Sequence, residues 1–181
     1  YGIEGNQQQQ HLYKLRWNLT KPIAVYLQTR HGQRSYHSAL ADNRSYELHY
    51  VAVEPSLTWL YKGIFRLTTT FKYEERNNHP RLGGEAANIQ TAQLEARFSQ
   101  PSLGALLLRG SYAAIHFTGT PGTSVAFTML DALQKGNNYL WQINWERQVG
   151  KGIEILLEYE GRKPGQGSTI HTGRMTIRAI L

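Results

Sequence analysis

Histidine is the side chain that first suggests chemistry in this sequence, since a neutral imidazole can bind a metal ion or act as a general base. Seven histidines occur among the 181 residues, but none forms a His-x-x-x-His or His-Glu-x-x-His motif. The sequence contains no cysteine, which excludes thiolate metal sites and disulfide bonds. We therefore expect neither a metal site nor a cofactor.

Hydrolytic chemistry finds equally little support. The sequence has no Gly-x-Ser-x-Gly motif, and Ser, His and Asp show no spacing that singles out a triad. An enzyme would require loop residues such as His79, Glu85 and His171 to converge on one pocket. We predict no catalytic residues.

Glycines and charged side chains near the C-terminus have structural interpretations. Four glycines surround a predicted loop: Gly161, Gly165, Gly167 and Gly173. No helix is predicted after this loop, so these are turn glycines rather than a phosphate cradle.

A charged ladder occupies alternate positions: Glu154, Glu158, Arg162, Arg174 and Arg178. Alternate residues of a strand share a face, so we expect cross-strand Glu–Arg pairs that neutralise one another in a lumen. A selectivity-setting or ligand-gripping patch is the alternative.

The strands that must carry this ladder are clearest in the last quarter of the chain. Tyr139, Trp141, Ile143 and Trp145 alternate with polar residues, which is the period of a β-strand. Three segments alternate in this way: residues 139–146, 152–162 and 174–181. They predict three consecutive antiparallel strands.

Six more strand-like segments precede them: residues 13–20, 23–30, 46–61, 65–74, 91–98 and 105–117. We expect a bulge near Pro55, where the alternation is disturbed. Residues 1–10 are rich in Gly and Gln and are predicted to form a polar loop or disordered end. Residues 125–133 fit either a short helix or an extra hairpin arm.

The connections between these segments alternate between short and long. The short ones are at residues 20–22, 62–63, 99–104 and 149–152, and the long ones are at 31–45, 75–88, 118–138 and 163–169. This pattern is typical of bacterial outer-membrane barrels. We predict an all-β, antiparallel up-and-down transmembrane β-barrel of about nine or ten strands within one domain, residues 1–181, or the C-terminal part of a larger barrel. Nine strands would start the first one at the long-loop rim, whereas closed bacterial barrels have even strand numbers, which favours a larger barrel with further strands upstream.

Aromatic residues are placed as a membrane interface would require. Five of them lie near predicted strand ends or on apolar faces: Trp17, Trp59, Tyr139, Trp141 and Trp145. We interpret them as interface anchors in contact with outer-membrane lipid, with ordinary core packing as the alternative.

The composition restricts the classes of molecule that this protein is expected to bind. The net charge is +7 and the isoelectric point is near 9.7, but the basic residues are scattered singly, so nucleic acid is not an expected partner. Mean hydropathy is −0.49, and no stretch of about 18 apolar residues predicts a transmembrane helix. A soluble antiparallel sandwich or lipocalin-like barrel that binds a small ligand has the same period-two pattern and remains the rival fold.

The final third of the sequence resembles a C-terminal segment of large, mostly uncharacterised outer-membrane β-barrel proteins of Bacteroidota. Five stretches carry the resemblance: Met129-Leu130-Asp131-Ala132-Leu133, Asn138-Tyr139-Leu140-Trp141, Tyr159-Glu160-Gly161-Arg162-Lys163, Ile170-His171-Thr172-Gly173 and Arg178-Ala179. Members of that family tend to end on an aromatic residue, and Leu181 departs from this. The resemblance implies a bacterial outer-membrane location and a role as scaffold, channel or envelope-assembly component. An outer-membrane hydrolase is the enzymatic alternative.

Overall fold

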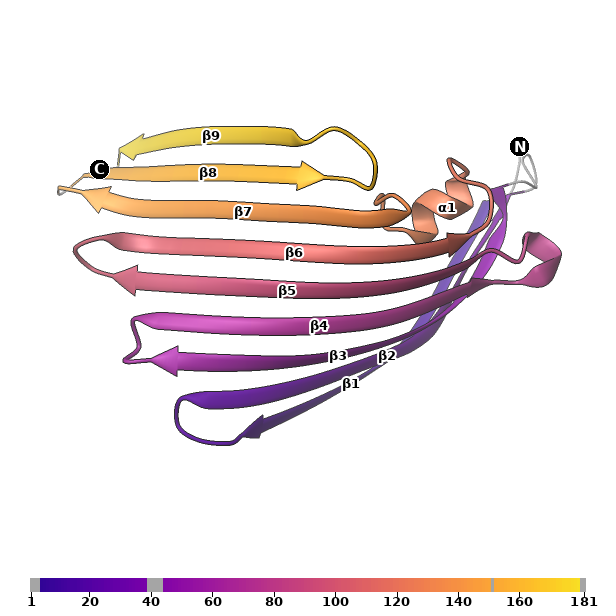
Figure 1. Cartoon of the computed structure of the whole chain (residues 1–181), viewed down its shortest axis with the longest axis horizontal. Coiled ribbons are helices and arrows are strands. Elements are labelled where there is room, and N and C mark those ends of the chain that lie inside the picture. The colour runs from indigo at the N-terminus through magenta and orange to yellow at the C-terminus, as the bar shows by residue number, and fades with distance from the viewer. Residues whose placement is uncertain (1–3, 39–43, 151, 180–181) are drawn as a thin grey trace.

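In the part of the chain that the structure describes, nine antiparallel strands follow one another in sequence order in a single sheet (Figure 1). The computed structural model describes residues 4–38, 44–150 and 152–179. The strands are β1 (Glu4–Asn18), β2 (Ile23–Ser38), β3 (Tyr46–Tyr61), β4 (Phe65–Asn78), β5 (Ala86–Gln100), β6 (Gly104–Thr118), β7 (Gly136–Val149), β8 (Ile153–Lys163) and β9 (Ile170–Ala179). A 3-10 helix, η2 (Pro80–Leu82), joins β4 to β5, and a helix, α1 (Ser124–Met129), lies between β6 and β7. The predicted all-β, up-and-down architecture is confirmed.

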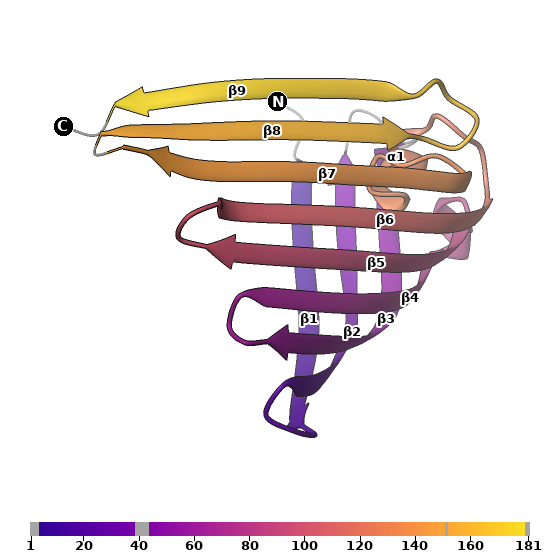
Figure 2. The same ribbon diagram turned by 60° about the vertical axis from the view of Figure 1, so that its left-hand side comes forward.

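The sheet is strongly curved and is open among the described residues. Figures 1 and 2 show it bending so that β1 to β3 turn behind the other strands, with α1 inside the bend. We call the face that contacts α1 the concave face and the opposite face the convex face. β1 pairs with β2 alone and β9 with β8 alone, so the described residues do not close into a barrel.

Connection lengths alternate as the sequence predicts. Tight turns join β1 to β2, β3 to β4, β5 to β6 and β7 to β8, and longer connections lie at the other rim. β1 therefore begins at the long-connection rim and β9 ends at the short-turn rim. The two edge strands run in the same direction.

Residues 4–10 form a strand, and the prediction of a polar loop there is wrong. Gln7 lies opposite Ser35 and Gln9 opposite Gln33 in the β1–β2 ladder. Backbone hydrogen bonds need no apolar side chain, so a polar segment can join a sheet when its neighbour is already extended. Residues 1–3 and Leu181, on which the remaining terminal expectations fall, lie outside the described residues.

Two predicted long loops are shorter than expected for the same reason. β2 continues to Ser38 and β3 begins at Tyr46, so most of the segment from 31 to 45 is strand. β4 similarly reaches Asn78, and β5 begins at Ala86. In residues 31–35 and 75–78 both faces are polar, so hydrophobic alternation gives no signal of the strand.

The predicted bulge at Pro55 is absent. Val53 lies opposite Tyr73 and Ser56 opposite Thr70, so three residue steps on β3 match three on β4. An inserted residue would make these counts unequal. Pro55 lacks the N–H that a ladder hydrogen bond needs, and the pairing with β4 is interrupted there without any change of register.

Residues 125–133, whose conformation the sequence leaves open, begin as a short helix. The Thr123 hydroxyl accepts a hydrogen bond from the Ala126 amide at 3.1 Å and caps the first turn of α1. Leu130 ends the helix, and Asp131 and Ala132 both have positive φ angles.

The described apolar core lies between α1 and the concave face. Its buried members are Tyr46, Leu48, Ala87, Ile89, Ile115, Phe117, Val125, Ala126, Met129 and Leu130. They come from β3, β5, β6 and the helical segment, so this segment is held against the long-connection end of the sheet.

We expect Met129→Ala to destabilise the protein by about 2–4 kcal/mol, because Met129 is fully buried and its truncation leaves a cavity. Equilibrium denaturant unfolding followed by near-ultraviolet circular dichroism measures the change. Phe127→Ala is the matched control on the same helix, since Phe127 is 67% exposed and its loss should cost no more than about 0.5 kcal/mol. Equal costs for the two variants would contradict the packing of α1 described above.

Candidate functional site

The convex face carries a continuous apolar band. Each strand contributes at least one large apolar side chain that is exposed: Leu15, Leu27, Leu57, Phe71, Leu94, Leu108, Ile143, Leu157 and Ile177. The pairing registers place these residues on one face from β1 to β9. An exposed apolar surface of this extent is unusual for a soluble monomer and indicates a contact surface.

Aromatic side chains border the band in two rows. The row near the short turns holds Trp17, Trp59, Tyr61, Phe65, Phe98 and Trp145, and the other row holds Tyr13, Tyr73, Tyr112, Tyr139 and Tyr159. Neighbouring rings contact each other within the rows: the Trp59 and Phe65 centroids are 5.9 Å apart, and those of Tyr112 and Tyr139 are 5.2 Å apart. Along the strands the rows are eight residues apart on β4, six on β7 and four on β1, or about 27, 20 and 14 Å at 3.4 Å per residue.

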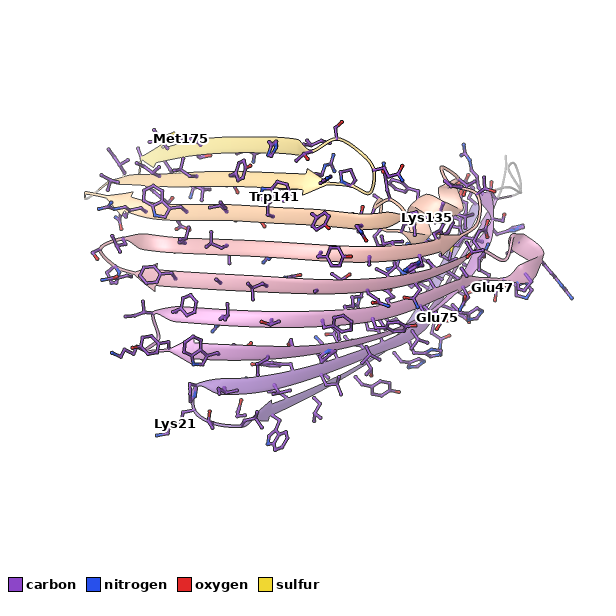
Figure 3. All side chains as sticks on the ribbon, in the orientation of Figure 1. Lys21, Glu47, Glu75, Lys135, Trp141 and Met175 are labelled. Carbon is purple, nitrogen blue, oxygen red and sulfur yellow. The ribbon has the colours of Figure 1, made fainter. Side chains whose placement is uncertain are left out.

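The five predicted interface aromatics all lie on the convex face. Trp17, Trp59 and Trp145 belong to the row near the short turns, and Tyr139 belongs to the other row. Trp141 lies between the rows, where Figure 3 shows it on β7. Its indole ring covers the backbone of Gly161 on β8, and any Cβ at that glycine would overlap the ring. All four tryptophans of the sequence are therefore on this face.

Beyond the second aromatic row the convex face becomes polar. Glu47 and Glu75 lie there, at the long-connection end of the sheet (Figure 3). His11 of β1 lies directly opposite His31 of β2 at the same end. The described residues contain no group of three or more potential metal-ligating side chains.

The concave face is polar and crossed by ion pairs. Arg30 contacts Glu54 at 3.2 Å across β2 and β3, and Arg109 contacts Glu95 at 2.6 Å across β6 and β5. Cross-strand pairs of this kind balance charge on one face of a sheet.

The predicted charged ladder lies on the concave face and is paired in part. Arg178 approaches Glu154 at 3.1 Å, and Arg174 approaches Glu158 at 3.9 Å. Arg162 lies opposite Ile170 in the β8–β9 register. Both arginines of the paired set are largely exposed, so these contacts contribute little to stability.

Arg76 of β4 links the sheet to the end of α1. Its guanidinium donates to both carboxylate oxygens of Asp131, at 3.0 and 2.6 Å, and to the Met129 carbonyl at 2.8 Å. On the sheet side it donates to Glu74 at 2.9 Å, and the ammonium of Lys72 contacts the same carboxylate. Arg76 thus satisfies a carbonyl at the helix C-terminus and holds two carboxylates at once.

The Arg76 guanidinium keeps its positive charge across the physiological pH range. Burial acts to lower the pKa of its guanidinium, but the hydrogen bonds and charges of Asp131 and Glu74 outweigh burial and raise the pKa above its ordinary value. Because the pKa of Arg76 is higher in the folded than in the unfolded protein, its ion pairs stabilise the fold fully below the unfolded-state pKa. This contribution is lost only as the pH rises through the folded-state pKa. The contact of Arg76 with Asp131 and the end of α1, which we call the Arg76–Asp131 anchor, therefore does not change with pH across the physiological range.

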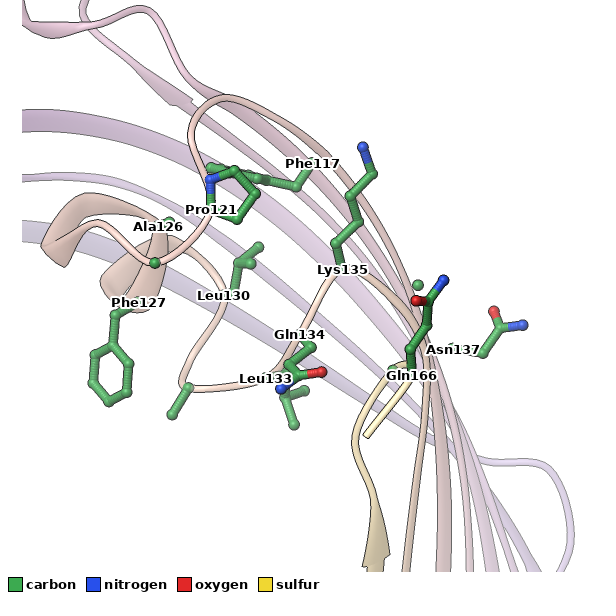
Figure 4. Close-up of a pocket in the computed structure, with 14 residues that line it drawn as sticks. Phe117, Pro121, Ala126, Phe127, Leu130, Leu133, Gln134, Lys135, Asn137 and Gln166 are labelled. Carbon is green, nitrogen blue, oxygen red and sulfur yellow. The ribbon is translucent and has the colours of Figure 1, made fainter. Parts of the chain in front are cut away.

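A cavity of about 870 Å³ lies beside α1 at the long-connection end (Figure 4). Its apolar lining comes mainly from Phe117, Phe127, Leu130 and Leu133, and Lys135 and Gln166 add polar groups. The β6–β7 and β8–β9 connections together form its walls.

The residues named for an enzymatic alternative lie on different elements. His79 and Glu85 belong to the β4–β5 connection, where the His79 imidazole accepts from the Arg81 amide at 3.2 Å and Glu85 accepts from Asn78 at 2.6 Å. His171, by contrast, stacks on Tyr159 of β8, with its Nδ1 2.8 Å from the Tyr159 hydroxyl.

Sequence reasoning did not find the Arg76–Asp131 anchor, whose partners are 55 residues apart. A carboxylate directly after the apolar Met129-Leu130 pair is a weak signal that a charged partner lies nearby. It does not say which of the 20 basic residues supplies it.

No protein-family model matches the sequence, and no curated protein matches it. Among the described residues, neither helical segment has the length and apolarity that crossing a membrane as a helix requires.

We expect Arg76→Met to cost about 3 kcal/mol, because it leaves the buried Glu74 short of a partner and frees the end of α1. Hydrogen exchange at the amides of residues 126–130 should accelerate in parallel. Arg178→Met is the matched control: it breaks an exposed Arg–Glu pair on the same face and should change stability by at most about 0.5 kcal/mol. Unchanged exchange in Arg76→Met would show that the anchor does not hold the helix.

Proposed function

We propose that this chain forms part of the wall of a bacterial outer-membrane β-barrel, with its convex face in lipid and its concave face toward a lumen. It would serve there as a scaffold, a channel or a component of an envelope assembly. The observation that carries the proposal is the exposed apolar band between two aromatic rows, with every tryptophan of the sequence on that face.

The dimensions of the band support a lipid contact. Transmembrane barrels present an apolar band about 25 Å tall, with aromatic girdles at both interfaces. At the strand tilt of such barrels, about 35–45°, the separation of about 27 Å along β4 corresponds to a height of about 19–22 Å, somewhat below that of the band. Lipid would also cover the large apolar side chains that the sheet leaves exposed, from Leu15 of β1 to Ile177 of β9.

The concave face has the character of a barrel interior. It combines the cross-strand ion pairs with many uncharged polar side chains, such as Gln142 and Asn144, which hydrogen-bond to each other at 3.3 Å. The α1 segment folds onto this face rather than away from the sheet. In a channel, such a segment would narrow the lumen near the long-connection rim.

The open edges of the sheet define the kind of partner that would complete the barrel. Because β1 and β9 run in the same direction, a direct seam between them would be parallel. A second copy in the same membrane orientation would give the same parallel seams. Closure by antiparallel pairing alone needs an odd number of further strands, and we propose that these belong to an upstream part of the same barrel.

The rival function, a soluble barrel or sandwich that holds a ligand in an apolar interior, requires the apolar set to point into a core. In the described residues that set lies exposed on the convex face, and the small buried core lies under α1 instead.

In vesicles of brominated lipid, the tryptophan fluorescence of the full-length protein should be strongly quenched, because the tryptophans would lie against acyl chains or their borders. Non-brominated vesicles of the same headgroup composition are the control. Fluorescence that is equal in the two lipids, or a protein that stays folded and monomeric in aqueous buffer without detergent, would sink the lipid contact.

Leu94→Arg should reduce the stability of the protein in vesicles by about 2–4 kcal/mol, because it places a charge in the middle of the lipid-facing band. Gln93→Arg, one residue earlier on β5, places the same charge on the concave face and should be tolerated. Folding yield and urea unfolding in vesicles measure both variants. Equal tolerance of the two arginines would mean that the convex face does not contact lipid.

A further inference from the structure

We infer that the concave face of β1 to β4 carries a binding site for a small oxyanion, a phosphate or carboxylate group, with Arg34 as its principal binding residue. The site is a pocket of about 210 Å³ bounded by these four strands and the end of α1. It is separate from the larger apolar cavity, which lies on the β7 and β8 side of the helix.

Among the described residues, the carboxylates around the pocket pair with basic side chains other than Arg34. Arg76 is matched by Glu74 and Asp131, and Lys72 contacts Glu74 as well. Arg30 is matched by Glu54. Among the described residues no ion pair involves Arg34, although its side chain lines the pocket.

Two guanidinium groups in this pocket also have unused buried donors. The Nε atoms of Arg30 and Arg34 are both buried, and neither has a hydrogen-bond partner in the described structure. A buried donor without an acceptor is unfavourable, and such groups commonly mark the place of an ion or water. Because Arg30 and Arg34 are four residues apart on β2, each guanidinium lacks an acceptor of its own, and a negatively charged acceptor is favoured at Arg34.

Tyr50 and Gly32 shape the floor between the two arginines. Gly32 lies midway between Arg30 and Arg34 on β2, and a Cβ there would lie 2.8 Å from the Tyr50 hydroxyl. The glycine therefore lets the phenol end approach the strand. The Tyr50 hydroxyl donates to the Gln10 amide oxygen at 3.0 Å, which leaves the Gln10 amide nitrogen as one more donor at the pocket.

These donors suit an oxyanion better than a neutral ligand. Guanidinium groups bind carboxylate and phosphate oxygens in a bidentate manner, and Gln10 and Lys72 can supply further hydrogen bonds. A volume of about 210 Å³ accommodates a small acid or one acidic group of a larger molecule. The inference depends on the concave face alone, so it holds whether or not the convex face contacts lipid.

Isothermal titration of the purified full-length protein with inorganic phosphate, and separately with succinate, tests the site. We expect saturable binding of at least one anion, weakened at least tenfold by Arg34→Gln. Arg34→Lys, which keeps the charge but cannot bind in a bidentate manner, should give an intermediate loss. Arg97→Gln is the matched control, since Arg97 is an exposed arginine on the same face near the short turns and its loss should change affinity less than twofold.

The pattern of losses decides the outcome. Phosphate preference would assign the site to phosphate groups, and succinate preference to carboxylates. Absence of binding by the wild-type protein at millimolar anion, unchanged binding by Arg34→Gln, or an equal loss in Arg97→Gln would each overturn the site. Circular dichroism of each variant checks its fold, and none of these results affects the quenching test of the lipid contact.

Discussion

Antiparallel backbone pairing is the constraint on which the rest of this structure depends. Within the described residues, eight ladders join nine strands, and pairs are missing from a ladder only beside Pro55, without a change of register. Because side chains alternate between faces, that register decides which residues share a surface. A slip of one residue in any ladder would exchange the apolar and polar faces of every strand beyond it. The two contrasting faces are thus one consequence of pairing, and no sheet-wide core is needed to produce them.

The α1 segment is where the polar face acquires a buried core. A helix of six residues has little stability of its own, since helix nucleation is costly. It persists because Met129 and its neighbours are buried against β3, β5 and β6, while Arg76 binds the helix end and Asp131. Apolar burial and a bidentate ion pair act at adjacent points, so the segment is fixed in both position and orientation. Arg76 and Asp131 also line the polar pocket of β1 to β4, so that pocket shares a wall with the contact that holds the end of α1.

Hydrophobic alternation predicted the strands in which apolar and polar residues alternate, and it missed the strand segments that are polar on both faces. Residues 139–145 show apolar and polar positions cleanly, and their strand, its neighbours and the alternating connection lengths were all predicted correctly. Residues 4–10 and 31–38 were missed, because polar side chains on both faces carry no periodic signal. Pro55 disturbs the pattern without inserting a residue, so it imitated a bulge. The Arg76–Asp131 contact depends on how a connection folds back over the sheet, which one-dimensional spacing does not contain.

The glutamine run in β1 has a register that it does not set itself. Gln7 to Gln10 would pair almost equally well after a shift of two residues, because their neighbours on β2 are also polar or glycine. Farther along the same strand, Leu15 faces Leu27 and Trp17 faces Val25, and these apolar pairs fix the alignment. The register of the glutamine run is thus set by the apolar pairs farther along β1 and not by the glutamines themselves. Inserting or deleting two glutamines would change the length of this polar part of β1 and leave the apolar band of the sheet unchanged. The polar part of the strand can therefore vary in length.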